Sequence, residues 1–90
     1  MRNRADNNRD EIISDLESFG AIVDKLPGGN GRPDILVGIF SRNYLLEVKR
    51  DGKQQLNDLQ QNWHNRWKGQ RAVVWNKQQA RLACGIITAN

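Results

Sequence analysis

Two apolar, β-rich segments separated by three residues constrain the fold of this 90-residue chain more than any other feature. Ile35 to Phe40 and Tyr44 to Lys49 are typical of the two strands of a hairpin. Both segments are apolar on both faces, as in the middle of a sheet that is covered on each side. Yet Asp34 opens the first strand, and Glu47 and Lys49 lie at the end of the second. Because buried charges need partners, these three side chains either pair with one another or hold a ligand.

The rest of the chain predicts helices and further strands around this hairpin. Before the hairpin we expect a helix over about Asp10–Phe19, a strand over Ala21–Leu26 and a glycine-rich loop over Pro27–Pro33. The hairpin follows, with its turn over Ser41–Asn43, and then a helix over about Asp58–Lys68 that Asn57 caps and Gly69 ends. The chain continues with a strand over Arg71–Trp75, a short helix over Lys77–Cys84, and an apolar tail over Gly85–Thr88 as a candidate edge strand. This α-β-β-β-α-β-α order predicts the α/β class, with a mixed central sheet flanked by helices. Ninety residues predict one domain over 1–90.

Composition narrows the partners of the chain. Fourteen Lys and Arg residues against ten Asp and Glu residues give a net charge of +4 and a pI of about 9.7. Such a balance favours a polyanion, and nucleic acid is the commonest soluble one. No apolar run approaches the roughly 20 residues that span a bilayer, and no apolar segment follows the first arginines, so we expect neither a membrane anchor nor a secretory signal. The single cysteine, Cys84, fits a reducing, cytoplasmic setting.

The three charges of the hairpin allow two interpretations. Glu47 and Lys49 point to one face of their strand, about 7 Å apart, and the return of the hairpin brings them toward Asp34. In the simpler interpretation, Glu47 and Lys49 form an ion pair and Asp34 is a turn residue. In the other, two carboxylates on neighbouring strands, completed by a backbone carbonyl and waters, bind Mg²⁺ or Mn²⁺, and the lysine acts on a phosphate.

A family resemblance favours the metal site. GRPD, twelve intervening residues and then EVK resemble the signature of the PD-(D/E)xK nucleases. An acid on the opening helix, the glycine-rich loop, the hairpin, the L-x-x-x-Q-x-x-W helix and a strand after glycine together resemble the VRR-NUC (virus-type replication-repair nuclease) domain, over about Glu11 to Trp75. The resemblance implies a restriction-endonuclease-like core.

The resemblance also implies roles for individual residues. Asp34 and Glu47 would bind the metal, with the Val48 carbonyl as a third ligand. Lys49 would position the attacking water, and Gln60 would reach back toward the site from the second predicted helix.

Further residues complete the implied site. Glu11 occupies the place of the first-helix acid, and Asp10 competes with it for that role. Arg32, Arg50 and Lys53 flank the proposed site and are candidates for contacts with DNA phosphates.

The implied function is a Mg²⁺- or Mn²⁺-dependent DNA endonuclease acting on Holliday junctions or related branched DNA. Stand-alone members of the family are phage or prophage proteins, so the resemblance implies the cytoplasm of a bacterial host. A homodimer would supply two sites for a symmetric junction. The alternatives are an inactive nucleic-acid-binding module, an accessory subunit of a repair or recombination complex, and a structural or protein-interaction domain.

Two other features of the second predicted helix lead to separate expectations. Trp63 and Trp67, four residues apart, are expected to pack the helix on the sheet. His64, the only histidine, is expected to be solvated.

Overall fold

The computed structural model describes residues 4–88, with side chains from residue 7 onward. Within it, helices and strands follow one another in the order predicted from the sequence. They are α1 (Arg4–Ser18), β1 (Ile22–Lys25), β2 (Ile35–Ile39), β3 (Arg42–Val48), α2 (Asp58–Arg66), β4 (Arg71–Val74) and α3 (Lys77–Ala83). No helix of this part of the chain is long and apolar enough to cross a membrane.

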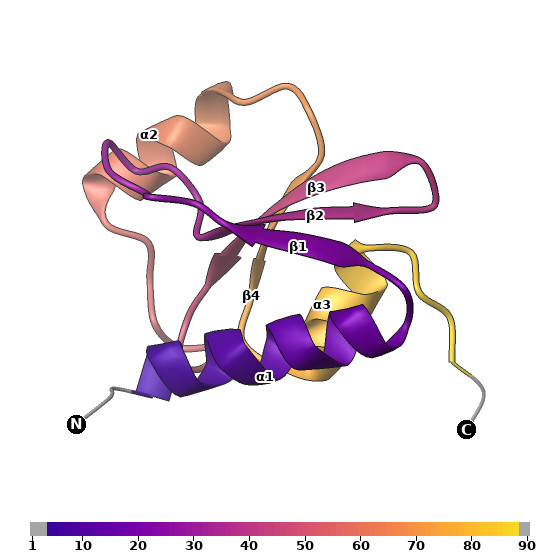
Figure 1. Cartoon of the computed structure of the whole chain (residues 1–90). Helices are drawn as coiled ribbons and strands as arrows, with labels where there is room; N and C mark the ends of the chain where they lie inside the picture. Colours follow the sequence, from indigo (N-terminus) through magenta and orange to yellow (C-terminus); the bar gives the residue numbers. More distant parts are fainter. Residues whose placement is uncertain (1–3, 89–90) are drawn as a thin grey trace.

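The strands form one mixed sheet in the order β1-β2-β3-β4. β1, β2 and β3 run antiparallel to their neighbours, whereas β4 runs parallel to β3 after the crossover through α2. Figure 1 shows α1 and α3 on one side of the sheet and α2 on the other. The predicted α/β class and helix-flanked mixed sheet are therefore confirmed.

The main core lies between the sheet and the pair α1 and α3. Alternate residues of β3 point to one face, so Tyr44, Leu46 and Val48 are buried there, against the fully buried Ile12 and Leu16 of α1. A polar contact joins the two helices beside this core: the Arg81 guanidinium donates two hydrogen bonds to the Asp15 carboxylate, at 2.8 and 2.6 Å. The same guanidinium lies 5.0 Å from the ring centroid of Phe19.

Three local predictions were wrong. The hairpin turn was predicted over Ser41–Asn43, but it consists of Phe40 and Ser41, and strand β3 begins at Arg42. Both turn residues have positive φ, 55° and 60°, as a two-residue type I′ turn requires, although neither is the usual glycine or asparagine. The segment Gly85–Thr88 is not a strand, and α1 begins at Arg4, well before Asp10.

Gly31 lets the glycine-rich loop lie directly against the start of α2. It has a φ of +80°, and a Cβ at this position would overlap the backbone carbonyl of Leu59. Only glycine combines that conformation with so close an approach of two backbones. The contact holds the first turn of α2, including Gln60, next to the loop that leads into Asp34.

This packing predicts that Gly31→Ala destabilises the protein more than Gly29→Ala. Both glycines have positive φ, so each substitution carries a left-handed penalty of about 1–2 kcal/mol. A Cβ at Gly29 meets no atom within 4 Å, whereas one at Gly31 meets backbone, which adds roughly 1–3 kcal/mol of overpacking. Urea unfolding of both variants measures the difference. Equal losses would show that the loop and α2 separate without cost.

The Asp15–Arg81 contact predicts that the free energy of unfolding depends on pH in the acid range. The Arg81 hydrogen bonds lower the pKa of Asp15 from its usual 3.8, against an opposing effect of burial. The unfolded chain therefore binds the proton more tightly, and the stabilisation is present above about pH 3.8 and lost as pH falls through the folded pKa. Asp15→Asn should lower the melting temperature by a few degrees at neutral pH and progressively less under acid. A difference that stays constant with pH would contradict this account.

Candidate active site

The hairpin register places Asp34 beside the end of β3. Ile35 pairs with Leu46, so the residue before Ile35 comes alongside Glu47 and Val48. The Asp34 backbone N–H donates to the Leu46 carbonyl at 3.0 Å, and its carboxylate oxygen Oδ2 accepts from the Val48 N–H at 2.7 Å. The Asp34 side chain thus continues the ladder between β2 and β3 past the last backbone pair.

Glu47 is a buried carboxylate with incomplete hydrogen bonding. Only 3% of its surface is exposed, and its Oε1 atom receives no hydrogen bond from the described residues. Burial, and then the charge of Asp34 and a hydrogen bond with it, raise the pKa of Glu47 to about 8, against an opposing effect of Lys49. Two carboxyl groups this close, one of them buried, form a site that favours a bound cation or proton.

Helix α2 supplies the third part of the site through Gln60. The Lys49 ammonium donates to Gln60 Oε1 at 2.8 Å, and Gln60 Nε2 donates to Glu47 Oε2 at 3.3 Å. Gln60 Oε1 also accepts from the backbone N–H of Asn57, the predicted N-cap, while the Asn57 side chain accepts from the Gln60 N–H. One amide therefore completes the capping box of α2 and orients both charged side chains of β3.

The residues present fit a divalent metal ion of the Mg²⁺ or Mn²⁺ type. Carboxylate oxygens are the preferred protein ligands of these ions, and Glu47 Oε1 has no other described partner. The Val48 carbonyl lies toward the same side as its N–H, which faces Asp34. No group of three or more His, Cys, Asp or Glu side chains that could hold a metal occurs in the described residues. Water and substrate oxygens would have to complete the coordination.

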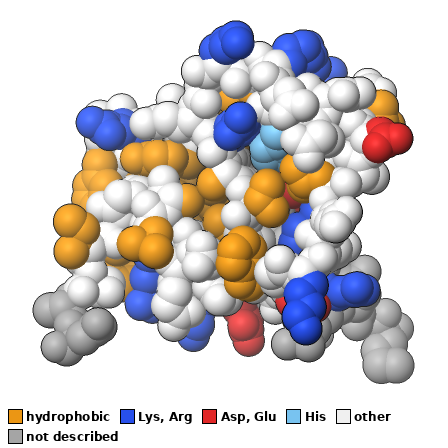
Figure 2. All heavy atoms as spheres, turned by 180° about the vertical axis from the view of Figure 1, so that it is seen from behind, with side chains coloured by type: hydrophobic (Ala, Val, Ile, Leu, Met, Phe, Trp, Pro, Cys, Tyr) orange, Lys and Arg blue, Asp and Glu red, His pale blue; other side chains and the backbone are white. Residues whose placement is uncertain are grey.

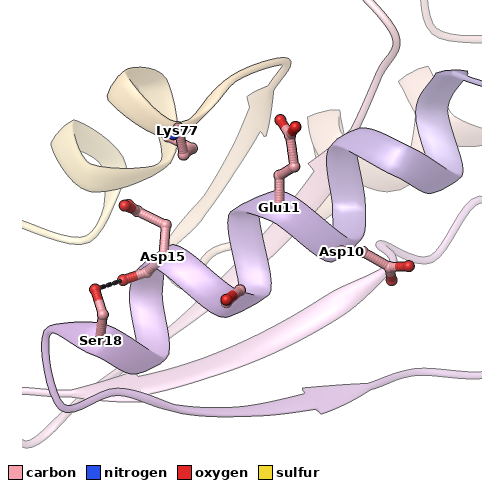
Figure 3. A pocket seen from close by; sticks show the side chains of 6 residues that line it. Asp10, Glu11, Asp15, Ser18 and Lys77 are labelled. Atoms are coloured by element: carbon pink, nitrogen blue, oxygen red, sulfur yellow. Dashed lines mark hydrogen bonds between the residues drawn. The ribbon is translucent and has the colours of Figure 1, made fainter.

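The first-helix acids do not join this cluster. Glu11 is exposed and lines a groove between α1 and α3, on the side of Lys77 (Figure 3). Asp10 also lines this groove, and its carboxylate lies 3.7 Å from the Lys25 ammonium. No hydrogen bond or ion pair described for either acid reaches Asp34 or Glu47, so the role of Glu11 stays a prediction.

The three residues predicted to contact DNA phosphates have exposed side chains and lie close in the chain to Asp34 and Lys49. Arg32 precedes Asp34 by two residues, and Arg50 and Lys53 lie in the turn that follows Lys49. Arg50 Nε is 3.6 Å from the Asp51 carboxylate in a solvent-exposed pair, which contributes little to stability. Each of these three cations can therefore bind a phosphate without breaking a buried ion pair.

Asn8 of α1 lies beside the site, although nothing in the sequence predicted this. Its Nδ2 lies within hydrogen-bond distance of the carbonyls of Lys49, Arg50 and Trp75, at 3.1, 2.8 and 3.2 Å. It ties the first helix to the ends of β3 and β4, beside the site. No pattern could have identified it, because the contacts are made to backbone atoms far along the chain.

The expectation for His64 was wrong. The ring is 4% exposed, its Nε2 has no described hydrogen-bond partner, and burial followed by the charges of Arg71 and Lys49 lowers its pKa. Its position four residues after Gln60 puts it on the same side of α2, which is a signal that the sequence did contain. Trp63 is buried as expected, but Trp67 is 43% exposed.

The raised pKa of Glu47 predicts how stability varies with pH in metal-free buffer. The folded protein keeps a proton that the unfolded chain releases, so the free energy of unfolding falls as pH rises from about 4.5 to about 8. Glu47→Gln should flatten that fall, and Glu17→Gln, an exposed acid of α1, should leave it unchanged. Urea titrations across this pH range measure the effect, and identical profiles for parent and Glu47→Gln would contradict the assignment.

The chain is similar to a known protein in structure rather than in sequence. No protein-family model and no curated protein matches the sequence. A solved structure described as a VRR_NUC domain superposes on this chain with a TM-score of 0.80, covering 93% of this chain and 97% of that one at 23% sequence identity. The arrangement of strands and helices around Asp34, Glu47 and Lys49 is thus that of a known domain. This chain has the VRR_NUC fold.

Proposed function

We propose that the chain is a metal-dependent DNA endonuclease that hydrolyses phosphodiester bonds. The observation that carries the proposal is the convergence of Asp34, Glu47, Lys49 and Gln60 at one end of the β2–β3 hairpin. A plain ion pair between Glu47 and Lys49 would leave no reason for a second carboxyl group to lie against the first. The similarity to a VRR_NUC domain structure supports the same conclusion.

Asp34, Glu47 and the Val48 carbonyl would hold the Mg²⁺ or Mn²⁺ ion. When bound, such an ion polarises a phosphate oxygen and lowers the pKa of a coordinated water. Lys49 is 7% exposed, and its ammonium has donors beyond the one that Gln60 accepts, so it can orient the attacking water and stabilise charge on the phosphate. Arg32, Arg50 and Lys53 would hold the flanking backbone.

Gln60 acts in this proposal as a positioning residue. It accepts from Lys49 and donates to Glu47, so it keeps the lysine donor and the carboxylate from forming a closed ion pair. Since its amide is also part of the capping box, its orientation is set by the start of α2. The geometry of the site therefore depends on where α2 begins.

We propose Holliday junctions or related branched DNA as the substrate, and a homodimer as the active form. A chain of this size offers little surface for a branched molecule, and two copies would place two sites about a two-fold axis. In this proposal the protein works in the cytoplasm of a bacterial host, as a phage or prophage product.

The proposal predicts cleavage that depends on both metal and site residues. Four-way junction, flap and linear duplex DNA are incubated with Mg²⁺, with Mn²⁺ or with chelator, and products are separated on denaturing gels. Asp34→Asn and Lys49→Ala should each lower the cleavage rate by roughly 100-fold or more, since each removes a metal ligand or a transition-state donor. DNA binding, measured in chelator, should stay within about threefold of the parent.

The control is Asp24→Asn, which removes an exposed acid on the edge strand β1. It should cleave like the parent. Binding without cleavage under every metal condition would overturn the nuclease in favour of a binding module. Cleavage that survives Asp34→Asn and Lys49→Ala would place the active site elsewhere.

A further inference from the structure

The sheet face that carries Glu47 and Lys49 continues into an open groove. Leu45 of β3 points to this face two residues before Glu47, and Leu36 of β2 lies next to it in the register. These two leucines line a cavity of about 750 Å³, which Trp67 borders at the end of α2. Leu45, in the lining of the groove, and Glu47, in the proposed active site, thus share one strand face and lie about 7 Å apart along β3.

Trp67 is a rigid aromatic wall of this groove. Its ring stacks on that of the buried Trp63, with centroids 4.9 Å apart and planes 16° from parallel. Its backbone N–H, at the C-cap of α2, donates to the Trp63 carbonyl at 3.0 Å. Although held in this way, the side chain stays 43% exposed. An exposed indole with a fixed orientation is a platform on which a nucleobase can stack.

The charges around the groove suit a nucleic acid strand. Its described lining contains Arg42 and the polar Asn43 and Gln70, but no acidic side chain. Three further exposed cations flank Trp67 along the chain: Arg66, Lys68 and Arg71. Figure 2 shows Lys and Arg side chains along the upper edge of the back face, the end of the molecule where α2 lies, above exposed apolar side chains. An apolar floor with a cationic rim matches the bases and phosphates of one strand.

We infer that the groove binds an unpaired nucleotide next to the scissile phosphate, with its base stacked on Trp67 and its phosphates held by Arg42 and the neighbouring cations. The inference rests on the proposed nuclease function and deepens it by naming the substrate class, branched DNA in which a nucleotide is unpaired, or becomes unpaired on binding, at the cleavage point. A paired base cannot enter, because both of its faces are covered in the duplex stack. The occupant that competes with this strand is a second copy of the chain.

The test measures binding in chelator, where no cleavage occurs. Fluorescein-labelled oligo(dT) and a blunt duplex of the same length are titrated with parent protein and variants, and anisotropy gives the dissociation constants. Trp67→Ala should weaken oligo(dT) binding by roughly fivefold or more, which follows from the stacking of one base, and change duplex binding by less than about twofold. Trp67→Phe should retain most of the oligo(dT) affinity.

Two further variants keep the test decisive if Trp67→Ala unfolds. Arg42→Ala leaves the tryptophan pair untouched and should also weaken the binding of oligo(dT). The dissociation constant of this variant should depend less on salt than that of the parent, because one phosphate contact is lost. Leu82→Ala, an exposed apolar residue of α3 away from the groove, is the matched control and should bind both probes like the parent.

Each remaining outcome counts against the inference. Unchanged oligo(dT) binding by Trp67→Ala and Arg42→Ala, or equal weakening on both probes, overturns it while leaving the nuclease proposal standing. If Trp67→Ala converts a dimer to a monomer in light scattering without any loss specific to the single strand, a second copy occupies the groove. If the parent binds neither probe, the proposed function fails as well.

Discussion

The register of the β2–β3 hairpin is the constraint on which the rest of the site depends. A two-residue turn at Phe40 and Ser41 sets it, and strands with a period of two allow no slip by one residue without reversing every side chain. In this register Tyr44, Leu46 and Val48 face the core under α1 and α3, and Leu45, Glu47 and Lys49 face the other way. The same register brings Asp34 to the last residues of β3, so packing of the core and assembly of the carboxyl pair are set by one turn.

The second dependence runs through α2. Gly31 allows the loop before Asp34 to contact the backbone at Leu59, and Gln60, the next residue, closes the capping box and reaches Lys49 and Glu47. The helix therefore cannot shift at its start without disturbing the polar contacts of the site. Its far end carries Trp67 and the groove, so one short helix links the proposed place of cleavage to the proposed place of strand binding.

Much of the fold and of the candidate site was predictable from the sequence, and the predictions that were wrong have physical causes. Apolar periodicity predicted each helix and strand and their order, because burial on one or both faces determines it. Asp34, Glu47 and Lys49 were recognisable because charges are rare in buried strands, and Gln60 through the family pattern. The turn was misplaced because Phe40 and Ser41 are unusual at positive φ. The burial of His64, by contrast, was indicated by its position four residues after Gln60, on the same side of α2. The contacts of Asn8 are made to backbone atoms, which leave no trace in residue type.

A metal ion bound between Asp34 and Glu47 is central to the proposed function, and manganese titration observed by NMR tests for it most directly. Bound Mn²⁺ broadens the amide signals of nearby residues in a ¹⁵N-labelled sample. If the ion binds there, the first signals to broaden are those of Asp34, Glu47, Val48 and Gln60, and Asp34→Asn prevents this broadening. Broadening that instead centres on Glu11 and Asp15, in the groove between α1 and α3, would contradict this placement of the ion.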